Sequence, residues 1–246
     1  MVKSKTKDSK NFAKKILNTI FPVKCVCCKT VSPDINIVCD KCMATLVREA
    51  MRKCKRCGCL PYLCRCKKIG NIEDVVTPFF YTGDKLKTAI YAVKKANLYY
   101  INEFFAKGMY NSVKSSDRIK IDEIDLITYI PRMKKSVRKY GYNQTKLLAE
   151  LVSKYSGIPC MPVLQSSGLY TQEQKTLSQS ERVSNVRDKF TVKKNKRSAV
   201  TTKTILLIDD VVTTGSTLSE CARMMKEAGA YKIYALCAAS VFSYYS

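Results

Sequence analysis

The sequence contains no histidine and no tryptophan, and its 246 residues include only 20 Asp and Glu against 44 Lys and Arg. Without histidine, no imidazole can bind a metal or act as a general base, so any metal must be held by cysteines or carboxylates. No run of about 18 apolar residues occurs, so we expect no transmembrane helix. Residues 1–24 also lack the apolar core and cleavage site of a signal peptide, and we expect a cytoplasmic protein.

The excess of basic residues gives a formal net charge of +24 and a pI near 9.6. A charge of this size favours polyanionic partners: nucleic acid, phosphates or an anionic membrane surface. A lysine-rich proteome is the alternative explanation, because lysine far outnumbers arginine. Residues 1–24 are a basic arm with an amphipathic stretch. We expect a short helix that packs on the next module or, alternatively, binds a membrane surface or nucleic acid.

Ten of the 13 cysteines lie in one short stretch, between Cys25 and Cys66. Most occur in pairs separated by two residues, a spacing that lets two thiolates converge on one tetrahedral zinc ion, and two such pairs complete a site. We therefore expect two structural Zn²⁺ sites within residues 25–70, with Cys59 as an alternative ligand in the second and Cys27 outside the first. The first ligand set is Cys25, Cys28, Cys39 and Cys42, and the second is Cys54, Cys57, Cys64 and Cys66.

Disulfides are the alternative use of these cysteines, but they are not expected in a chain without a signal peptide. Few large apolar residues separate the cysteines, so metal should supply the stability of this segment. The remaining three cysteines, Cys160, Cys221 and Cys237, have apolar neighbours in the sequence, and we expect them to be small core residues. Basic residues surround the second ligand set: Arg52, Lys53, Lys55, Arg56, Arg65, Lys67 and Lys68.

Across residues 71–246, apolar runs typical of strands alternate with amphipathic runs typical of helices. We expect strands over 75–81, 124–130, 204–208 and 231–241, and helices over 86–93, 101–113, 143–155 and 218–228. This order predicts an α/β domain with an open parallel sheet, in which ligands bind beyond the carboxyl ends of the strands. Residues 165–187 are polar and without clear periodicity, and we expect a long loop that covers the site.

The strand over residues 204–208 leads into two acids and then a short turn of hydroxyl residues with one glycine. A helix follows at once, so its N-terminal amides and the positive end of its dipole would face the turn, which suits a phosphate. The acids suit sugar hydroxyls or a metal. A plain turn into a capped helix is the alternative. The acids are Asp209 and Asp210, and the turn residues are Thr213, Thr214, Gly215, Ser216 and Thr217.

A second candidate anion site follows the strand over residues 124–130. Pro131 opens a basic loop that contains Arg132 and Arg138, and the helix over residues 143–155 would direct its N-terminus to the same place. A solvated basic loop without a ligand is the alternative.

The acid pair and its turn resemble the phosphoribosyl diphosphate (PRPP) loop of type I phosphoribosyltransferases. With three other blocks they resemble the ComF family, competence-associated phosphoribosyltransferase-like proteins with a double zinc ribbon. The sequence departs from this family at Tyr140, where family members usually have Arg. It also differs from purine-salvage relatives, which have a catalytic carboxylate at the position that Thr213 occupies here. The other blocks are the cysteine-rich segment, Gly141-Tyr142-Asn143-Gln144 after the basic loop, and the spaced residues Gln174, Leu177, Arg182, Asn185 and Phe190.

The resemblance implies a type I phosphoribosyltransferase-like domain over residues 71–246 that binds PRPP with Mg²⁺. Asp209 and Asp210 would bind the ribose hydroxyls, directly or through the metal. Residues 213–217 would bind the 5′-phosphate, and Arg132 would lie near the diphosphate, with Arg138 in the same basic loop.

The resemblance also implies a role in natural transformation, with binding of single-stranded DNA and with a competence helicase or DNA-uptake proteins as partners. The alternatives are an active phosphoribosyltransferase that uses a small acceptor and a regulatory PRPP sensor. The sequence reveals no catalytic base and no nucleobase pocket that would name an acceptor.

Overall fold

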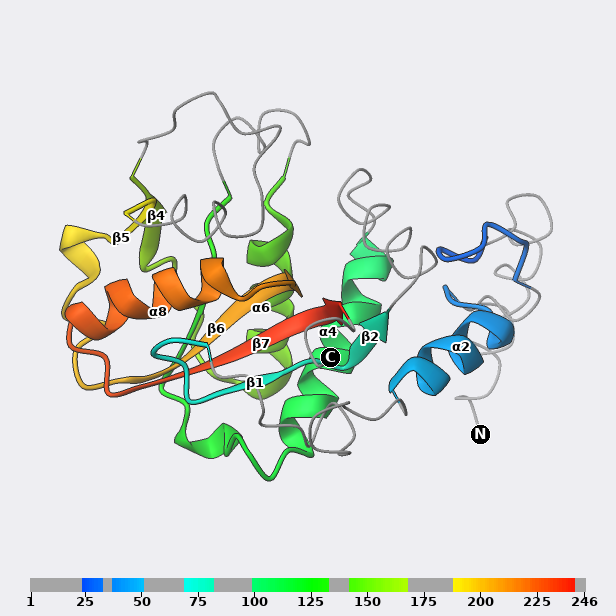
Figure 1. Ribbon diagram of the computed structural model, residues 1–246, viewed down its shortest axis with the longest axis horizontal. Helices are drawn as coiled ribbons and strands as arrows, with labels where there is room; N and C mark the ends of the chain where they lie inside the picture. The colour runs from blue at the N-terminus through cyan, green and yellow to red at the C-terminus, as the bar shows by residue number, and fades with distance from the viewer. Residues whose placement is uncertain are drawn as a thin grey trace, which may run out of the picture.

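The computed structural model describes residues 24–32, 37–50, 69–81, 99–132, 142–167 and 188–241. Within these segments, helices cover both faces of a five-stranded parallel sheet, which confirms the expected α/β fold (Figure 1). The sheet consists of β1 (Asp74–Val76), β2 (Phe79–Tyr81), β3 (Leu126–Tyr129), β6 (Thr204–Val212) and β7 (Lys232–Val241). The helices are α2 (Asp40–Ala50), α4 (Tyr99–Lys114), α6 (Gln144–Ser156) and α8 (Ser216–Glu227), with short 3₁₀ turns η1 (Ile121–Glu123) and η2 (Lys194–Lys196).

Strand β6 lies inside the sheet, between β7 on one side and β3 on the other. On its far side β7 pairs first with β1 and then, further along, with β2. The single strand expected over residues 75–81 is therefore two strands, interrupted at Thr77 and Pro78. The break has a simple cause, because proline has no N–H to donate to a sheet ladder.

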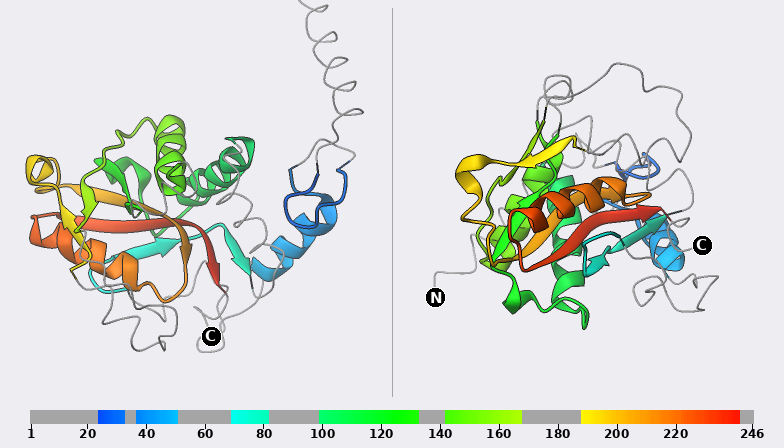
Figure 2. Two further views of the ribbon diagram at one scale, coloured as in Figure 1. Left: turned by 90° about the horizontal axis from the view of Figure 1, so that it is seen from above. Right: turned by 60° about the vertical axis from the view of Figure 1, so that its left-hand side comes forward.

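The side chains of β6 alternate between two apolar layers. Ile205 and Leu207 pack in the layer beneath α8, whereas Leu206 and Ile208 pack in the layer beneath α4 and α6. All four side chains are fully buried. This alternation explains the unbroken apolar run, since a strand covered on both faces has no polar side (Figure 2).

The cysteine-rich segment is joined to this fold through α2, which packs against β2. Val26, Val38 and Leu46 are buried in the same apolar layer as α4 and α6. The sequence analysis did not predict α2, because it assigned this stretch to metal binding through Cys39 and Cys42. Contact with the α/β layers supplies the apolar surface that the segment lacks.

A second, two-stranded antiparallel sheet consists of β4 (Leu164–Ser166) and β5 (Phe190–Val192). The sequence analysis did not predict it, because each strand is only three residues long. None of the helices in the described segments is long and apolar enough to span a membrane. Several expected features lie outside the described residues: the N-terminal arm, the second cysteine set, the helix over 86–93, the loop with Arg138 and most of the 165–187 segment.

Candidate phosphate site and cysteine cluster

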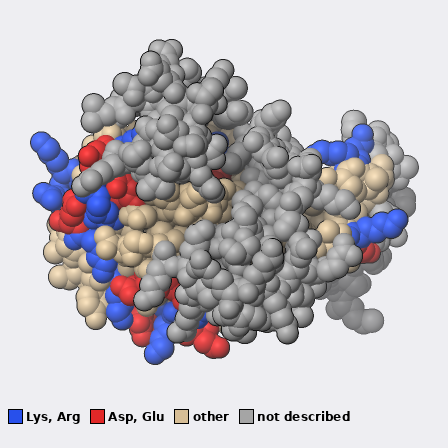
Figure 3. Space-filling view, viewed as in Figure 1, with Lys and Arg blue, Asp and Glu red and all other residues tan. Residues whose placement is uncertain are grey.

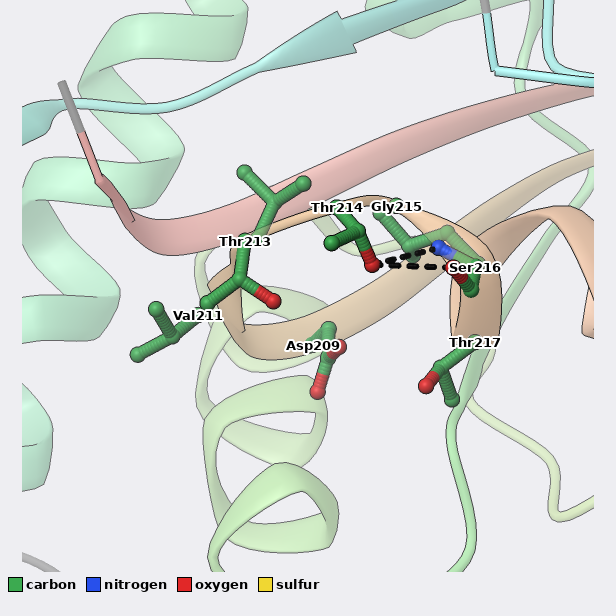
Figure 4. Close-up of a pocket in the computed structure, with 9 residues that line it drawn as sticks. Asp209, Val211, Thr213, Thr214, Gly215, Ser216 and Thr217 are labelled. Atoms are coloured by element: carbon green, nitrogen blue, oxygen red, sulfur yellow. Dashed lines mark hydrogen bonds between the residues drawn. The ribbon is translucent and has the colours of Figure 1, made fainter. Parts of the chain in front are cut away.

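The turn after β6 forms an open hollow at the carboxyl edge of the sheet (Figure 4). Gly215 is the N-cap residue of α8 and has no side chain that could cap the helix. The hollow encloses about 210 Å³, including space open to solvent, and its lining includes the carboxylate of Asp209. All five expected turn residues line it: Thr213, Thr214, Gly215, Ser216 and Thr217.

Hydroxyl groups surround this hollow. The Oγ1 atom of Thr214 lies 2.9 Å from Oγ of Ser216 and accepts a 3.4 Å hydrogen bond from the Ser216 amide. The hydroxyl oxygens of Thr213 and Thr217 are directed toward the space beside Asp209 (Figure 4). Because the first amides of α8 and the positive end of its dipole face the same place, the hollow suits a phosphate group.

Gly215 is required at its position for two reasons. Its φ angle of 80° lies in the left-handed region, which disfavours residues with a Cβ atom. A Cβ atom there would also lie 2.5 Å from Cδ1 of Ile69. Ile69 is 5% exposed and belongs to the turn that precedes β1, so the turn and the phosphate loop are in direct contact.

The two acids lie on opposite faces of the sheet, because successive residues of a strand alternate. Asp209 continues the series of Ile205 and Leu207 on the α8 side and lines the hollow. Asp210 lies on the α6 side, where its Oδ2 atom is 3.2 Å from Nη2 of Arg132. The sequence predicted a carboxylate pair, but it did not predict that the two groups have different neighbours.

Arg132 is held between the sheet and α6. Its Nη2 atom donates both to Asp210 and, at 3.1 Å, to Oε1 of Gln144. The Tyr142 side chain lies close by: burial raises the pKa of Tyr142, and its neighbours Asn102 and Arg132 lower it in part. Sequence analysis named Arg132 and, in the Gly141–Gln144 block, Tyr142 and Gln144, but it did not predict the contact of Arg132 with Gln144 or the place of Asn102 beside Tyr142.

The N-terminus of α6 differs from that of α8. The Asn143 side chain accepts a hydrogen bond from the Lys146 amide at 3.3 Å and therefore caps the helix. Thr145 donates to the Ile130 carbonyl at 2.7 Å. Part of the donor capacity expected for a second anion site is thus used within the protein, and Arg132 is the cation that the described residues place there.

Two buried thiols lie beneath the acids. Burial raises the pKa of Cys221 and of Cys237 well above the usual value, and the negative charge of Asp209 raises both further. Both thiols are therefore protonated at neutral pH and add no charge below the hollow. These two cysteines are core residues, as expected, whereas Cys160 is only partly buried.

The first expected ligand set forms a compact cluster. The sulfur atoms of Cys25, Cys28, Cys39 and Cys42 all lie within 4.8 Å of one another. The Sγ atoms of Cys28 and Cys39 are 3.7 Å apart. Four sulfurs at about 2.3 Å from a tetrahedral zinc ion would be about 3.8 Å apart, so the cluster can hold a metal ion of this kind.

The cysteine pKa values shift in both directions within the cluster: burial raises the pKa of Cys42 well above its usual value, whereas the pKa values of Cys28 and Cys25 are lowered. Hydrogen bonding from Thr30 lowers the pKa of Cys28 to about 6. Although burial opposes it, hydrogen bonding to the backbone amides of Cys39 and its neighbours holds the pKa of Cys25 below the usual value. Burial raises the pKa of Cys27 to about 12, and this thiol is not part of the cluster, which agrees with the expectation that Cys27 is not a ligand.

Replacing Gly215 with alanine should reduce stability more than replacing Gly157, a matched control. Gly157 also has a positive φ angle, 77°, but a Cβ atom there would meet nothing within 4 Å. Gly157→Ala should therefore lower the free energy of unfolding by about 1–2 kcal/mol from backbone strain alone. Gly215→Ala should lower it by roughly 1–3 kcal/mol more, because of overlap with Ile69. Urea unfolding measures both, and equal losses would contradict the close contact.

Comparison with known proteins agrees with this arrangement. A family model described as the phosphoribosyl transferase domain matches residues 163–243, which include β6, the phosphate loop and α8. Competence protein F of Haemophilus influenzae is 26% identical over 222 residues, which are 87% of this chain and 95% of that protein.

Two solved structures are each similar to this chain with a TM-score of 0.37. Each match covers 56% of this chain at 22% sequence identity. They are the allosteric regulatory enzyme of purine biosynthesis, and glutamine PRPP amidotransferase from B. subtilis complexed with ADP and GMP. The matched region covers 25% and 26% of those chains, so this chain spans about a quarter of their length.

The similarity to Competence protein F extends over nearly the whole chain, and the phosphoribosyl transferase match covers the site described above. Among the described residues, a four-cysteine cluster precedes the parallel α/β sheet in the chain. These matches identify a phosphoribosyl transferase domain over residues 163–243 and a similarity to Competence protein F over nearly the whole chain, which supports a ComF-like, phosphoribosyltransferase-like protein.

Proposed function

We propose that this protein binds PRPP or a related phosphorylated sugar at the hollow after β6 and binds single-stranded DNA in natural transformation. The observation that carries the first part is the N-terminus of α8, with glycine as its N-cap residue, next to Asp209 and four hydroxyl residues. Amides, hydroxyls and a helix dipole would hold the 5′-phosphate, and the carboxylate would accept hydrogen bonds from the ribose hydroxyls.

In this proposal the two acids have different roles. Asp209 faces the hollow and would contact the ribose. Asp210 is paired with Arg132, so a cation in the protein already neutralises it. Magnesium bound with the diphosphate would supply positive charge for the leaving group. Arg132 could then turn from Asp210 toward the diphosphate, so the same guanidinium would serve the free protein and the complex.

The sugar-phosphate site is tested by neutralising its carboxylate. Asp209→Asn should weaken PRPP binding by roughly 10–100-fold, since a hydrogen bond to a charged group contributes about 1.5–3 kcal/mol. Asp122→Asn is the control, because Asp122 is an exposed carboxylate of η1, before β3. Calorimetric titration with PRPP and Mg²⁺ measures the effect. Absence of binding by the unaltered protein would reject this part of the proposal.

We further propose that Zn²⁺ occupies the Cys25–Cys42 cluster and a second site formed by the other cysteine set. The separation of 3.7 Å between two of the sulfur atoms supports zinc in the first site. This proposal keeps the division of the chain into a basic arm (1–24), a double zinc ribbon (25–70) and a phosphoribosyltransferase-like domain (71–246).

The metal proposal is tested by a pair of cysteine variants. Cys42→Ser should reduce the zinc content from about two ions per chain to about one, because a serine hydroxyl is a poor ligand beside three thiolates. Cys27→Ser should leave the content unchanged, although Cys27 is equally buried and close to the cluster. Elemental analysis of purified protein gives the counts. Equal losses from the two variants would contradict the ligand assignment.

The proposal for single-stranded DNA depends on the distribution of charge. The described residues include 20 of the 44 Lys and Arg but 15 of the 20 Asp and Glu. On the face shown in Figure 3, basic and acidic side chains are mixed and form no uniform basic patch. Most of the excess positive charge therefore belongs to the remaining segments, above all to the cysteine-rich stretch and the N-terminal arm, followed by the loop after Arg132.

Two triple variants with the same change in net charge test this assignment. Replacing Arg65, Lys67 and Lys68 with glutamine should weaken binding of single-stranded DNA and reduce the salt slope by about 2, at roughly 0.7 per lost phosphate contact. Replacing Lys146, Lys203 and Lys226 should change either quantity little, because each of these is paired with a carboxylate. Fluorescence anisotropy over a range of salt concentrations measures both. Equal effects would contradict the assignment.

An active phosphoribosyltransferase is the alternative, supported by the fit between the site and PRPP rather than by any catalytic base. Release of diphosphate from PRPP with a panel of acceptors, and its loss in Asp209→Asn, would favour it. In either case we place the protein in the cytoplasm, where PRPP and incoming single strands would both be available.

A further inference from the structure

The turn over residues 69–72 lies directly against the phosphate loop. The Ile72 amide donates a 2.9 Å hydrogen bond to the Ile69 carbonyl and closes the turn. The Glu73 amide then donates to the Ile233 carbonyl of β7 at 2.9 Å, so the turn is tied to the sheet. In the sequence, Ile69 is the third residue after Cys66, where the cysteine-rich stretch ends.

Two successive residues of this turn contact the start of α8. The side chain of Ile69 occupies the place where a Cβ atom of Gly215 would stand, with Cδ1, Cγ1 and Cγ2 at 2.5, 2.9 and 3.3 Å from it. The backbone of Gly70 lies against Ser219, so that a Cβ atom on Gly70 would be 2.2 Å from the Ser219 hydroxyl oxygen. The Ser219 amide in turn donates to the Gly215 carbonyl at 2.8 Å.

The turn does not itself contact the bound phosphate of the proposed function. Ile69 is 5% exposed and packs in the apolar layer with Val212 and Leu218, which precede and follow the loop. It is not among the residues that line the hollow. Its contact is with the opposite side of Gly215, the residue with the greatest conformational freedom in the loop.

We propose that Ile69 is a positioning residue for the sugar-phosphate site, holding Gly215 in the left-handed conformation that directs the first amides of α8 into the hollow. The inference depends on the proposed function, since it concerns the same site. A loop that already has its binding conformation need not be ordered by the ligand. When only a fraction of the molecules has this loop conformation, the apparent affinity is lower by that fraction.

The test compares Ile69→Ala with Ile72→Ala. The two isoleucines belong to the same turn and the same apolar layer and have similar exposure, 5% and 7%. The three atoms nearest to a Cβ built on Gly215 all belong to Ile69. Both variants should lower the melting temperature. Ile69→Ala should weaken binding of ribose 5-phosphate roughly tenfold, whereas Ile72→Ala should change it less than about twofold. Calorimetry well below both melting temperatures measures the affinities.

Two further measurements protect this test from a folding artefact. Ile69→Val keeps the Cγ1 and Cγ2 atoms and should recover most of the affinity. Amide hydrogen exchange over residues 211–219 should be faster in Ile69→Ala than in Ile72→Ala. Equal affinities and equal exchange in the two alanine variants would overturn the positioning role while leaving the proposed function intact. If the unaltered protein fails to bind ribose 5-phosphate or PRPP, both fail together.

Discussion

The structure depends on one strand, β6, buried between β7 and β3 and covered on both faces. Because β6 is buried from Thr204 to Ile208, its side chains there are apolar on both faces after Thr204. From Asp209 to Val211 the strand is only partly buried, and acidic side chains occur there. Strand alternation then places Asp209 and Asp210 on opposite faces. One carboxylate meets the hollow beneath the α8 N-terminus, and the other meets Arg132, so a single geometric rule gives two adjacent acids separate environments.

The surroundings of these acids show how charge is balanced before any ligand binds. Arg132 compensates Asp210, and Gln144 fixes the position of the guanidinium. The buried thiols of Cys221 and Cys237 stay protonated and leave the negative charge to the carboxylates. The N-cap residue of α8, Gly215, has no side chain to cap the helix, and the Ser216 amide makes a long, 3.4 Å hydrogen bond to Thr214, whereas Asn143 caps α6.

The cysteine-rich segment and the α/β domain are connected by contacts as well as by the chain. Helix α2 packs on β2, and its apolar residues belong to the same layer as α4 and α6. The turn that begins at Ile69 packs on Gly215. The cysteine cluster and α2 therefore pack in the apolar layer of α4 and α6, whereas the turn at Ile69 packs in the layer of α8, on the other face of the sheet.

Sequence alone determined the features encoded by local pattern. Apolar runs predicted β6 and β7, the run of acids, hydroxyls and glycine predicted the turn between β6 and α8 that lines the hollow, and cysteine spacing predicted the cluster of Cys25, Cys28, Cys39 and Cys42. Tertiary structure decided what depends on neighbours distant in sequence: the pairing of Arg132 with Asp210, the packing of Ile69 on Gly215 and the docking of α2 on β2. The reason is physical, because periodicity and spacing act along the chain, whereas these contacts join residues between about 30 and 150 positions apart, whose proximity exists only once the sheet has formed.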